Sequence, residues 1–363
     1  MSWIGISDLR VPAFDPRGVG AAPVSAAPEP DDGILPVGSL VIEVTYVAQS
    51  RIPQRILRYE KTRGWLRRFS VILSADGVLA VDARQGDTLS HAQVTIAVPP
   101  RETRLRITYS WNAPQRTGIL TAENLDQEVL HQAEFDAPVP LPLEDGRDII
   151  TNGDATRIGR DTRYLALSDQ VEPVGLASGI ARGTPVETPT GPRLVERLRL
   201  GDLVMTAGSG PQPVRWIVRR EVPALGRFRP IRLRAPYFGL SRDILVAPDH
   251  RVVVSGAEAE YLFGEDSVLA EAVHLVDGKS VRHENTEQTL WYYHVLLDEH
   301  ECLKYAGMWG ESLFVGAMGR SPDLIATTAL AAMPSTAIPR HRRFARPVLS
   351  AYEARSLAAS LCA

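Results

Sequence analysis

The chain has 363 residues, which is more than a domain with a single hydrophobic core usually contains, and this length favours two domains. Hydrophobic residues make up 44% and charged residues 23%, as is typical of a globular protein. A formal net charge of -3 gives no general attraction to nucleic acid, so we expect no nucleic-acid partner. The two cysteines, Cys302 and Cys362, exclude a disulfide framework.

The first residues, Met1 to Asp8, lack a basic region followed by a sustained apolar stretch. No window approaches the ~18 apolar residues of a membrane span. We therefore expect neither a secretory signal peptide nor a transmembrane segment. The expected location is the cytoplasm, or outside the cell if the protein is exported or assembled by a leaderless route.

Prolines and glycines without periodicity fill residues 15–38, so residues 1–37 are predicted to form an extended arm or linker. Beyond them, apolar alternation indicates short strands, and Asp76-Gly77 predicts a hairpin. Because no helical period separates the strands, residues 38–170 are predicted to form an antiparallel sandwich. The predicted strands are 40–47, 69–74, 78–82, 92–98, 105–111, 118–122 and 164–168.

The order of these elements, with Arg106 to Pro114 following the hairpin, resembles the laminin G/concanavalin-like jelly roll. The resemblance implies a carbohydrate or protein ligand. Trp65, Tyr109 and Trp111 could form an aromatic platform on which a sugar ring stacks. Burial of these aromatic residues in the core is the alternative.

Glu172 to Gly175, with its proline and glycine, predicts a domain boundary. The next module, residues 176–316, again favours strands, and residues 321–363 are predicted to form a short helical tail. In that tail, 324–333 and 352–361 are rich in alanine and leucine at helical spacing. The fold class is therefore all-β with an α-helical C-terminal tail. The predicted strands of the second module are 214–219, 231–235, 244–247, 251–255, 268–272 and 291–297.

Residues 179–206 combine a short strand, a turn at Pro189 to Pro192, and a Gly201-Asp202 turn that opens another strand. This segment resembles the opening of a bacterial Hedgehog/intein (Hint) domain, a self-processing β horseshoe. Members of that family begin with a cysteine that attacks the preceding peptide carbonyl. In an ungapped comparison Gly183-Thr184 match the family, and the place of the cysteine falls on Gly179, which has no side chain.

Three later positions extend the resemblance. His250 matches the family histidine that protonates the leaving amide nitrogen, whereas Ala247 replaces the hydroxyl residue three positions earlier. His300 matches the histidine of the closing motif, and Gly310-Glu311-Ser312-Leu313 resembles the sequence that ends such a module. The resemblance thus implies catalytic positions at 179, 247, 250 and 300.

The missing side chain at Gly179 and the missing hydroxyl at Ala247 favour a Hint module that has lost self-cleavage. We expect it to serve a structural, adhesive or binding role. The alternative is self-cleavage near Ser178-Gly179, in which the Ser178 hydroxyl attacks and His250 and His300 assist. An alcohol without an adjacent base is a poor nucleophile, and a one-residue slip along a strand turns the side chain away.

Histidines are concentrated between residues 250 and 300, at His250, His274, His283, His294 and His300. A zinc or copper site could draw on them, and His294 and His300 would share one face of a continuous strand. No His-Glu-x-x-His or Cys-x-x-Cys spacing accompanies them, so we expect no metal and no cofactor. Exposed sheet edges favour self-association.

Overall fold

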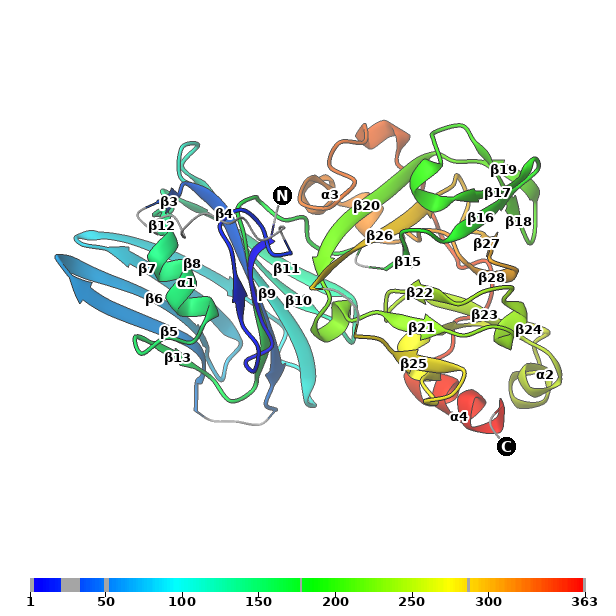
Figure 1. Ribbon diagram of the computed structural model, residues 1–363, viewed down its shortest axis with the longest axis horizontal. Helices are drawn as coiled ribbons and strands as arrows, with labels where there is room; N and C mark the ends of the chain where they lie inside the picture. Colours follow the sequence, from blue (N-terminus) through cyan, green and yellow to red (C-terminus); the bar gives the residue numbers. More distant parts are fainter. Residues whose placement is uncertain (1–2, 21–32, 49–51, 177, 286–287, 362–363) are drawn as a thin grey trace. The chain divides into compact units, whose positions relative to one another are not determined.

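The computed structural model describes residues 3–20, 33–48, 52–176, 178–285 and 288–361. The chain divides into two compact units, residues 1–175 and 176–363, and each is described by itself (Figure 1). Antiparallel strands dominate both units, which confirms the predicted all-β class. In the described ranges, we find no helix with the length and apolar character that crossing a membrane requires.

The first unit is a sandwich of two sheets. The larger sheet has the order β11-β10-β9-β4-β14-β1-β2, and the smaller has the order β13-β5-β6-β7-β8. The larger contains β1 (Trp3–Ser7), β2 (Ala13–Phe14), β4 (Val37–Tyr46), β9 (Thr103–Asn112), β10 (Thr117–Asn124), β11 (Val129–Asp136) and β14 (Thr162–Ser168). The smaller contains β5 (Gln54–Arg63), β6 (Trp65–Leu73), β7 (Val78–Gln85), β8 (Thr88–Thr95) and β13 (Thr156–Ile158). A short pair, β3 (Ile34–Leu35) with β12 (Leu141–Pro142), and the helix α1 (Leu143–Ile150) complete the unit.

Apolar side chains of the two sheets meet in a shared core. The rings of Phe69 and Tyr109 pack edge to face at 5.4 Å, and the Trp111 indole donates a hydrogen bond to the Leu35 carbonyl at 3.0 Å. Trp65 is 54% exposed, whereas Tyr109 and Trp111 are buried. These three side chains therefore do not form the exposed platform that the sequence suggested, because the strand face carrying Tyr109 and Trp111 points into the core.

The N-terminal segment differs from the extended arm expected of residues 1–37. β1 pairs with β14 and so belongs to the larger sheet. All five residues of β1 are buried, including Trp3, Ile4 and Ile6. This burial favours pairing over an extended arm. The predicted Asp76-Gly77 hairpin is confirmed, since β6 pairs with β7 around it.

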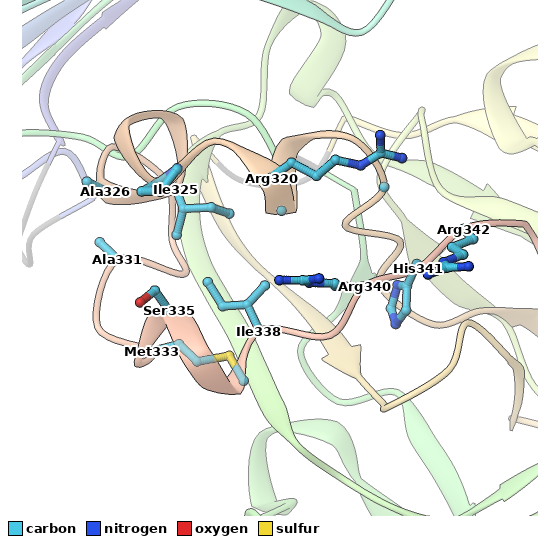
Figure 2. Close-up of a pocket in the computed structure, with 13 residues that line it drawn as sticks. Arg320, Ile325, Ala326, Ala331, Met333, Ser335, Ile338, Arg340, His341 and Arg342 are labelled. Atoms are coloured by element: carbon cyan, nitrogen blue, oxygen red, sulfur yellow. The ribbon is translucent and has the colours of Figure 1, made fainter.

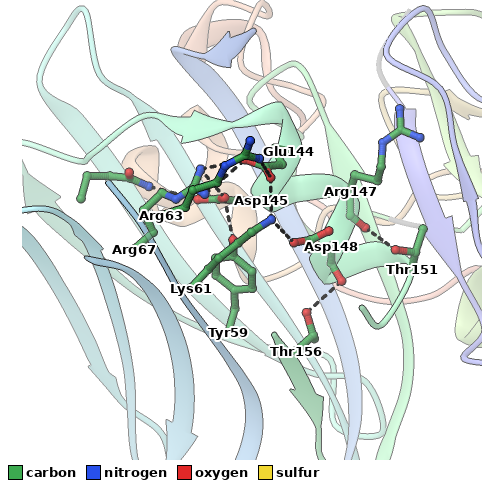
Figure 3. Close-up of polar contacts among 11 residues, drawn as sticks. Tyr59, Lys61, Arg63, Arg67, Glu144, Asp145, Arg147, Asp148, Thr151 and Thr156 are labelled. Carbon is green, nitrogen blue, oxygen red and sulfur yellow. Dashed lines mark hydrogen bonds and ion pairs between the residues drawn. The ribbon is translucent and has the colours of Figure 1, made fainter. Parts of the chain in front are cut away.

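A network of charged side chains joins α1 to the smaller sheet (Figure 3). The Asp145 side chain is 1% exposed; it accepts a hydrogen bond from the Tyr59 hydroxyl at 2.6 Å and lies 2.9 Å from Arg67. Lys61 bridges Glu144 and Asp148 at 2.5 and 2.9 Å. The Lys61 hydrogen bond lowers the pKa of Glu144, whereas burial raises the pKa of Asp145.

Replacing Asp145 with alanine is expected to lower the free energy of unfolding by about 3–5 kcal/mol, because it removes a partner of the buried Arg67 guanidinium. The matched control is Arg58→Ala, whose partner Glu60 lies 3.1 Å away in an exposed pair. That variant should lose less than about 1 kcal/mol. Urea unfolding of both proteins measures the difference, and equal losses would contradict a structural role for the network.

The second unit is built on two further sheets. One has the order β20-β26-β15-β22-β21-β25; the other follows β17-β16-β27-β28-β23-β24, with β18 paired to β27 and β19. The first contains β15 (Ile180–Ala181), β20 (Trp216–Pro223), β21 (Ile231–Leu233), β22 (Ile244–Val246), β25 (Val281–His283) and β26 (Thr289–Leu296). The second contains β16 (Pro185–Thr188), β17 (Gly191–Leu194), β18 (Leu203–Thr206), β19 (Gly210–Pro213), β23 (Arg251–Ser255), β24 (Ser267–Glu271), β27 (Cys302–Tyr305) and β28 (Met308–Glu311). The helix α2 (Ala257–Phe263) follows β23.

The C-terminal tail packs on the second unit. The helix α4 (Ala351–Leu361) confirms one predicted helix, and it buries Ala354 and Leu357 in the core of this unit. The other predicted helix, 324–333, is wrong in extent, because α3 covers only Pro322–Ala326. The hydroxyls of Thr327 and Thr328 bond back to the carbonyls of the preceding turn, an interaction that competes with helix continuation.

Candidate functional site

The Ser178 side chain enters a polar cluster at the start of the second unit. Its Oγ lies 3.3 Å from Nδ1 of His250 and 3.3 Å from Oε1 of Glu311. The segment is fixed by β15, which pairs with both β22 and β26, and by the Ala247 amide, which donates to the Gly179 carbonyl at 2.8 Å. Ala247 therefore contributes its backbone here and presents a methyl group where the family has a hydroxyl.

Position 179 cannot readily carry a side chain. Gly179 has a φ of +145°, and a Cβ there would lie 2.6 Å from the Tyr293 carbonyl oxygen. The ungapped comparison assigned the nucleophile's place to this residue, but Ser178 is the residue whose side chain reaches His250. The expectation that a one-residue slip would turn Ser178 away does not hold, because Ser178 precedes β15 and strand alternation does not constrain it.

We expect Gly179→Ala to destabilise the protein more than Gly183→Ala. Both glycines have positive φ, which costs other residues about 1–2 kcal/mol, but nothing lies within 4 Å of a Cβ at Gly183. The overlap with Tyr293 should add roughly 1–3 kcal/mol at position 179. Thermal unfolding of the two variants provides the comparison. Equal losses would show that the backbone adjusts freely around residue 179.

His250 is buried and held from both sides of its ring. Its Nε2 lies 2.6 Å from the Tyr305 hydroxyl, and its backbone amide donates to the Ala247 carbonyl at 3.0 Å. In the tautomer whose Nε2–H donates to Tyr305, Nδ1 is an acceptor that faces Ser178. Burial lowers the pKa of His250 to about 4, so the imidazole is neutral at pH 7 and able to accept a proton.

Glu311, at the end of β28, supplies a buried carboxylate. Its Oε1 accepts the Arg251 backbone N–H at 3.0 Å, and its Oε2 lies 3.3 Å from the Arg251 guanidinium. Burial alone raises the pKa of Glu311, but Arg251 and His300 outweigh it and hold the pKa well below its usual range. Sequence reasoning missed this role and quoted Glu311 only within the closing segment. A lone acidic residue in the otherwise uncharged run 306–315 is the signal that could have found it.

His300 lies beside Glu311, and none of its described contacts is with Ser178. Its Nε2 is 3.8 Å from Oε2 of Glu311, and its Nδ1 accepts the Ala345 N–H at 2.9 Å. The rings of Phe314 and Phe344 pack against it edge to face at 5.3 and 5.4 Å. The C-terminal tail therefore helps to place His300 against the carboxylate.

His294 completes the cluster from β26. Its ring lies edge to face with that of His250, with 5.3 Å between centroids, and burial lowers its pKa to about 3. Neither of its ring nitrogens has a hydrogen-bond partner among the described residues. The expected continuous strand through His294 and His300 is wrong, because β26 ends at Leu296.

The other two histidines of the predicted group lie outside this cluster. His274 pairs with Glu271 at 3.3 Å, and His283 is exposed on β25. The structure thus brings together only part of the histidine group that the sequence singled out.

A separate hollow of about 850 Å³ lies among the tail segments around α3 (Figure 2). Its lining is apolar at Ile325, Met333 and Ile338 and basic at Arg320 and Arg340. Neither Ser178 nor the residues that contact its hydroxyl contribute to this lining. The hollow is therefore distinct from the polar cluster at Ser178.

The two sheets of the second unit bring Ser178, the residue just before Gly179 and β15, against a buried histidine and a buried carboxylate. Residues 178–317 match the family model of the Hint domain, and this part of the chain is a Hint domain. No curated protein matches the chain.

Three solved structures illustrate what the chain is similar to. The CBM40 of a Ruminococcus gnavus IT-sialidase is 16% identical, with a TM-score of 0.27, over 37% of this chain and 76% of that one. The LG1-3 region of the laminin alpha2 chain is 10% identical, with a TM-score of 0.25, over 86% of this chain and 55% of that one. The NanB sialidase from Streptococcus pneumoniae is 10% identical, with a TM-score of 0.27, over 52% of this chain and 30% of that one.

Proposed function

We propose that the Hint domain cleaves its own chain before Ser178, with the Ser178 hydroxyl as the nucleophile. The observation that supports this is the position of Oγ, 3.3 Å from both His250 Nδ1 and Glu311 Oε1. A hydroxyl beside a neutral imidazole meets the main requirement for activating an alcohol. Loss of cleavage was expected from the missing side chain at Gly179 and the missing hydroxyl at Ala247. The position of Ser178 beside His250 answers the first of these, whereas the methyl group of Ala247 still replaces the family hydroxyl.

The reaction is an acyl shift from nitrogen to oxygen. Oγ attacks the carbonyl carbon of Ala177, a residue outside the described ranges, while its proton passes to His250 Nδ1. The tetrahedral intermediate then breaks its C–N bond, and the Ser178 nitrogen leaves as an amine with the proton returned by the imidazolium. The product is an ester between the Ala177 carboxyl group and the Ser178 hydroxyl. Water hydrolyses this ester and separates residues 1–177 from residues 178–363.

The neighbouring groups assist this step through His250. Glu311 Oε1 lies 3.9 Å from His250 Nδ1, so its negative charge favours the transient imidazolium. The Tyr305 hydroxyl holds the opposite edge of the ring. His300 acts as a positioning residue for Glu311, because its Nε2 lies 3.8 Å from that carboxylate. Cleavage is expected to be slow, since an alcohol is a weaker nucleophile than a thiolate.

Hydroxylamine provides the test, because it attacks esters far more readily than amides. The full chain is incubated with and without hydroxylamine at neutral pH, and its intact mass is followed over several days. We expect the mass of the 363-residue chain to decline, faster with hydroxylamine, and a fragment ending in a hydroxamate at residue 177 to accumulate. An unchanged mass under both conditions would overturn the proposal. It would favour the reading that the Hint domain is a structural or binding platform that stays attached to the sandwich.

A further inference from the structure

His294 has an unusual environment for a buried polar side chain. It is 3% exposed, and both ring nitrogens lack a hydrogen-bond partner among the described residues. Leaving a buried polar atom unsatisfied is costly, so such atoms usually have a function. The His294 ring packs edge to face against that of His250, and one of its nitrogens lies within 4.8 Å of a ligand atom of His250 and of Glu311.

From this arrangement we infer that His250, His294 and Glu311 form a binding site for a divalent transition metal ion of the zinc type. Each residue offers one ligand atom, and these three atoms lie within 4.8 Å of one another. His250 Nδ1 and Glu311 Oε1 are 3.9 Å apart. Ligand atoms of a tetrahedral zinc site are about 3.4 Å apart, so side-chain adjustments of roughly 1 Å would close the three onto an ion.

The donor types and their surroundings agree with this assignment. Two imidazoles and one carboxylate are a common zinc ligand set, and three protein ligands leave the fourth position open. Ser178 Oγ lies 3.3 Å from His250 Nδ1 and from Glu311 Oε1, so it borders the site. An ion bound to Nδ1 would occupy the lone pair that accepts the Ser178 proton, so ion binding and the proposed cleavage exclude each other. A contact on the non-ligating nitrogen usually fixes the tautomer of a metal-binding histidine. The Tyr305 hydroxyl, 2.6 Å from His250 Nε2, meets that requirement.

The three ligands come from separate parts of the second unit. His294 lies on β26, His250 lies in the turn between β22 and β23, and Glu311 ends β28. Their side chains converge only after both sheets have formed. Arg251 occupies the Oε2 side of Glu311, which leaves Oε1 directed toward His250 and Ser178.

Metal binding is tested in the Ser178→Ala chain, so that the outcome is independent of cleavage. The protein is freed of metal with a chelator and titrated with Co²⁺, whose visible absorption reports four-coordinate binding, and then with Zn²⁺ as a competitor. We expect one Co²⁺ per chain, displaced by one Zn²⁺. Adding His294→Leu should raise the dissociation constant at least 100-fold. The matched control, His283→Ala, should leave it unchanged, since His283 is exposed on β25.

The His294→Leu variant is suited to this test because the histidine makes no hydrogen bond that leucine would lose. We expect its circular dichroism spectrum and its metal-free unfolding temperature to equal or exceed those of the parent. A folded His294→Leu protein that binds Co²⁺ as tightly as its parent would overturn the inference. Absence of one-to-one binding by the Ser178→Ala chain would overturn it as well.

Discussion

Ser178→Ala is expected to abolish cleavage before residue 178, and Ser178→Cys is expected to accelerate it at least about 10-fold in the presence of a thiol reductant. Alanine removes the only atom of residue 178 that can attack a carbonyl, whereas a thiol is more acidic and more nucleophilic than an alcohol. Both substitutions leave the backbone of β15 unchanged. The fraction of intact chain, measured by mass spectrometry over time, gives the cleavage rates of the parent chain and of the two variants.

The matched control for Ser178 is Ser255→Ala, an exposed serine at the end of β23 in the same unit. Its rate should equal that of the parent chain. Cleavage of the Ser178→Ala protein at the parental rate would show that another group, or a contaminating protease, breaks the chain. A Ser178→Cys protein that is folded but no faster would show that proton transfer and nucleophile strength do not limit the reaction.

His250→Gln is expected to slow cleavage by about 10²–10⁴-fold, the usual contribution of a general acid–base group. Glutamine keeps a polar side chain near Tyr305 but cannot accept a proton from Ser178 and return it to the leaving nitrogen. The rate is followed in the same mass assay, with circular dichroism to confirm folding.

His283→Gln, an exposed histidine of the same unit, serves as the control for His250 and should cleave like the parent. If both histidine variants cleave at one rate, His250 takes no part in proton transfer. If only the His250 variant slows, and by less than about 10-fold, the ring merely positions Ser178.

Much of the fold could be predicted from the sequence because apolar alternation is a local property. Every predicted strand overlaps an observed one in both units. β5 (Gln54–Arg63) was missed because five of its ten residues are charged at neutral pH and two more, Gln54 and Thr62, are polar, which obscures the alternation. The eight-residue α1 was missed because so short a helix shows little periodicity.

The candidate site could be predicted only in part. His250 was found because it sits in a local motif, but the contacts that define the site join residues far apart in the chain. Ser178 meets Glu311, 133 positions later, through the pairing of several strands. The choice of Gly179 over Ser178 depended on an ungapped comparison, and the two are distinguished by the Ser178 contact with His250 and by the backbone geometry at Tyr293.

The tail illustrates the same limit. Its composition predicted helices, but nothing local indicated that Phe344 and Ala345 contact His300. These contacts link the C-terminal tail to the carboxylate of Glu311 through one histidine. The composition predicted this segment only as a helical tail. In the structure, Phe344 and Ala345 contact His300 and so help to hold the site in place.

The most direct measurement is the N-terminal sequence of the C-terminal product that forms during incubation of the purified chain. Our account predicts a fragment that begins Ser-Gly-Ile-Ala, from Ser178 onward, with a free amino group. A fragment that begins at Gly179 or at any other residue would contradict the assignment of Ser178 as the nucleophile.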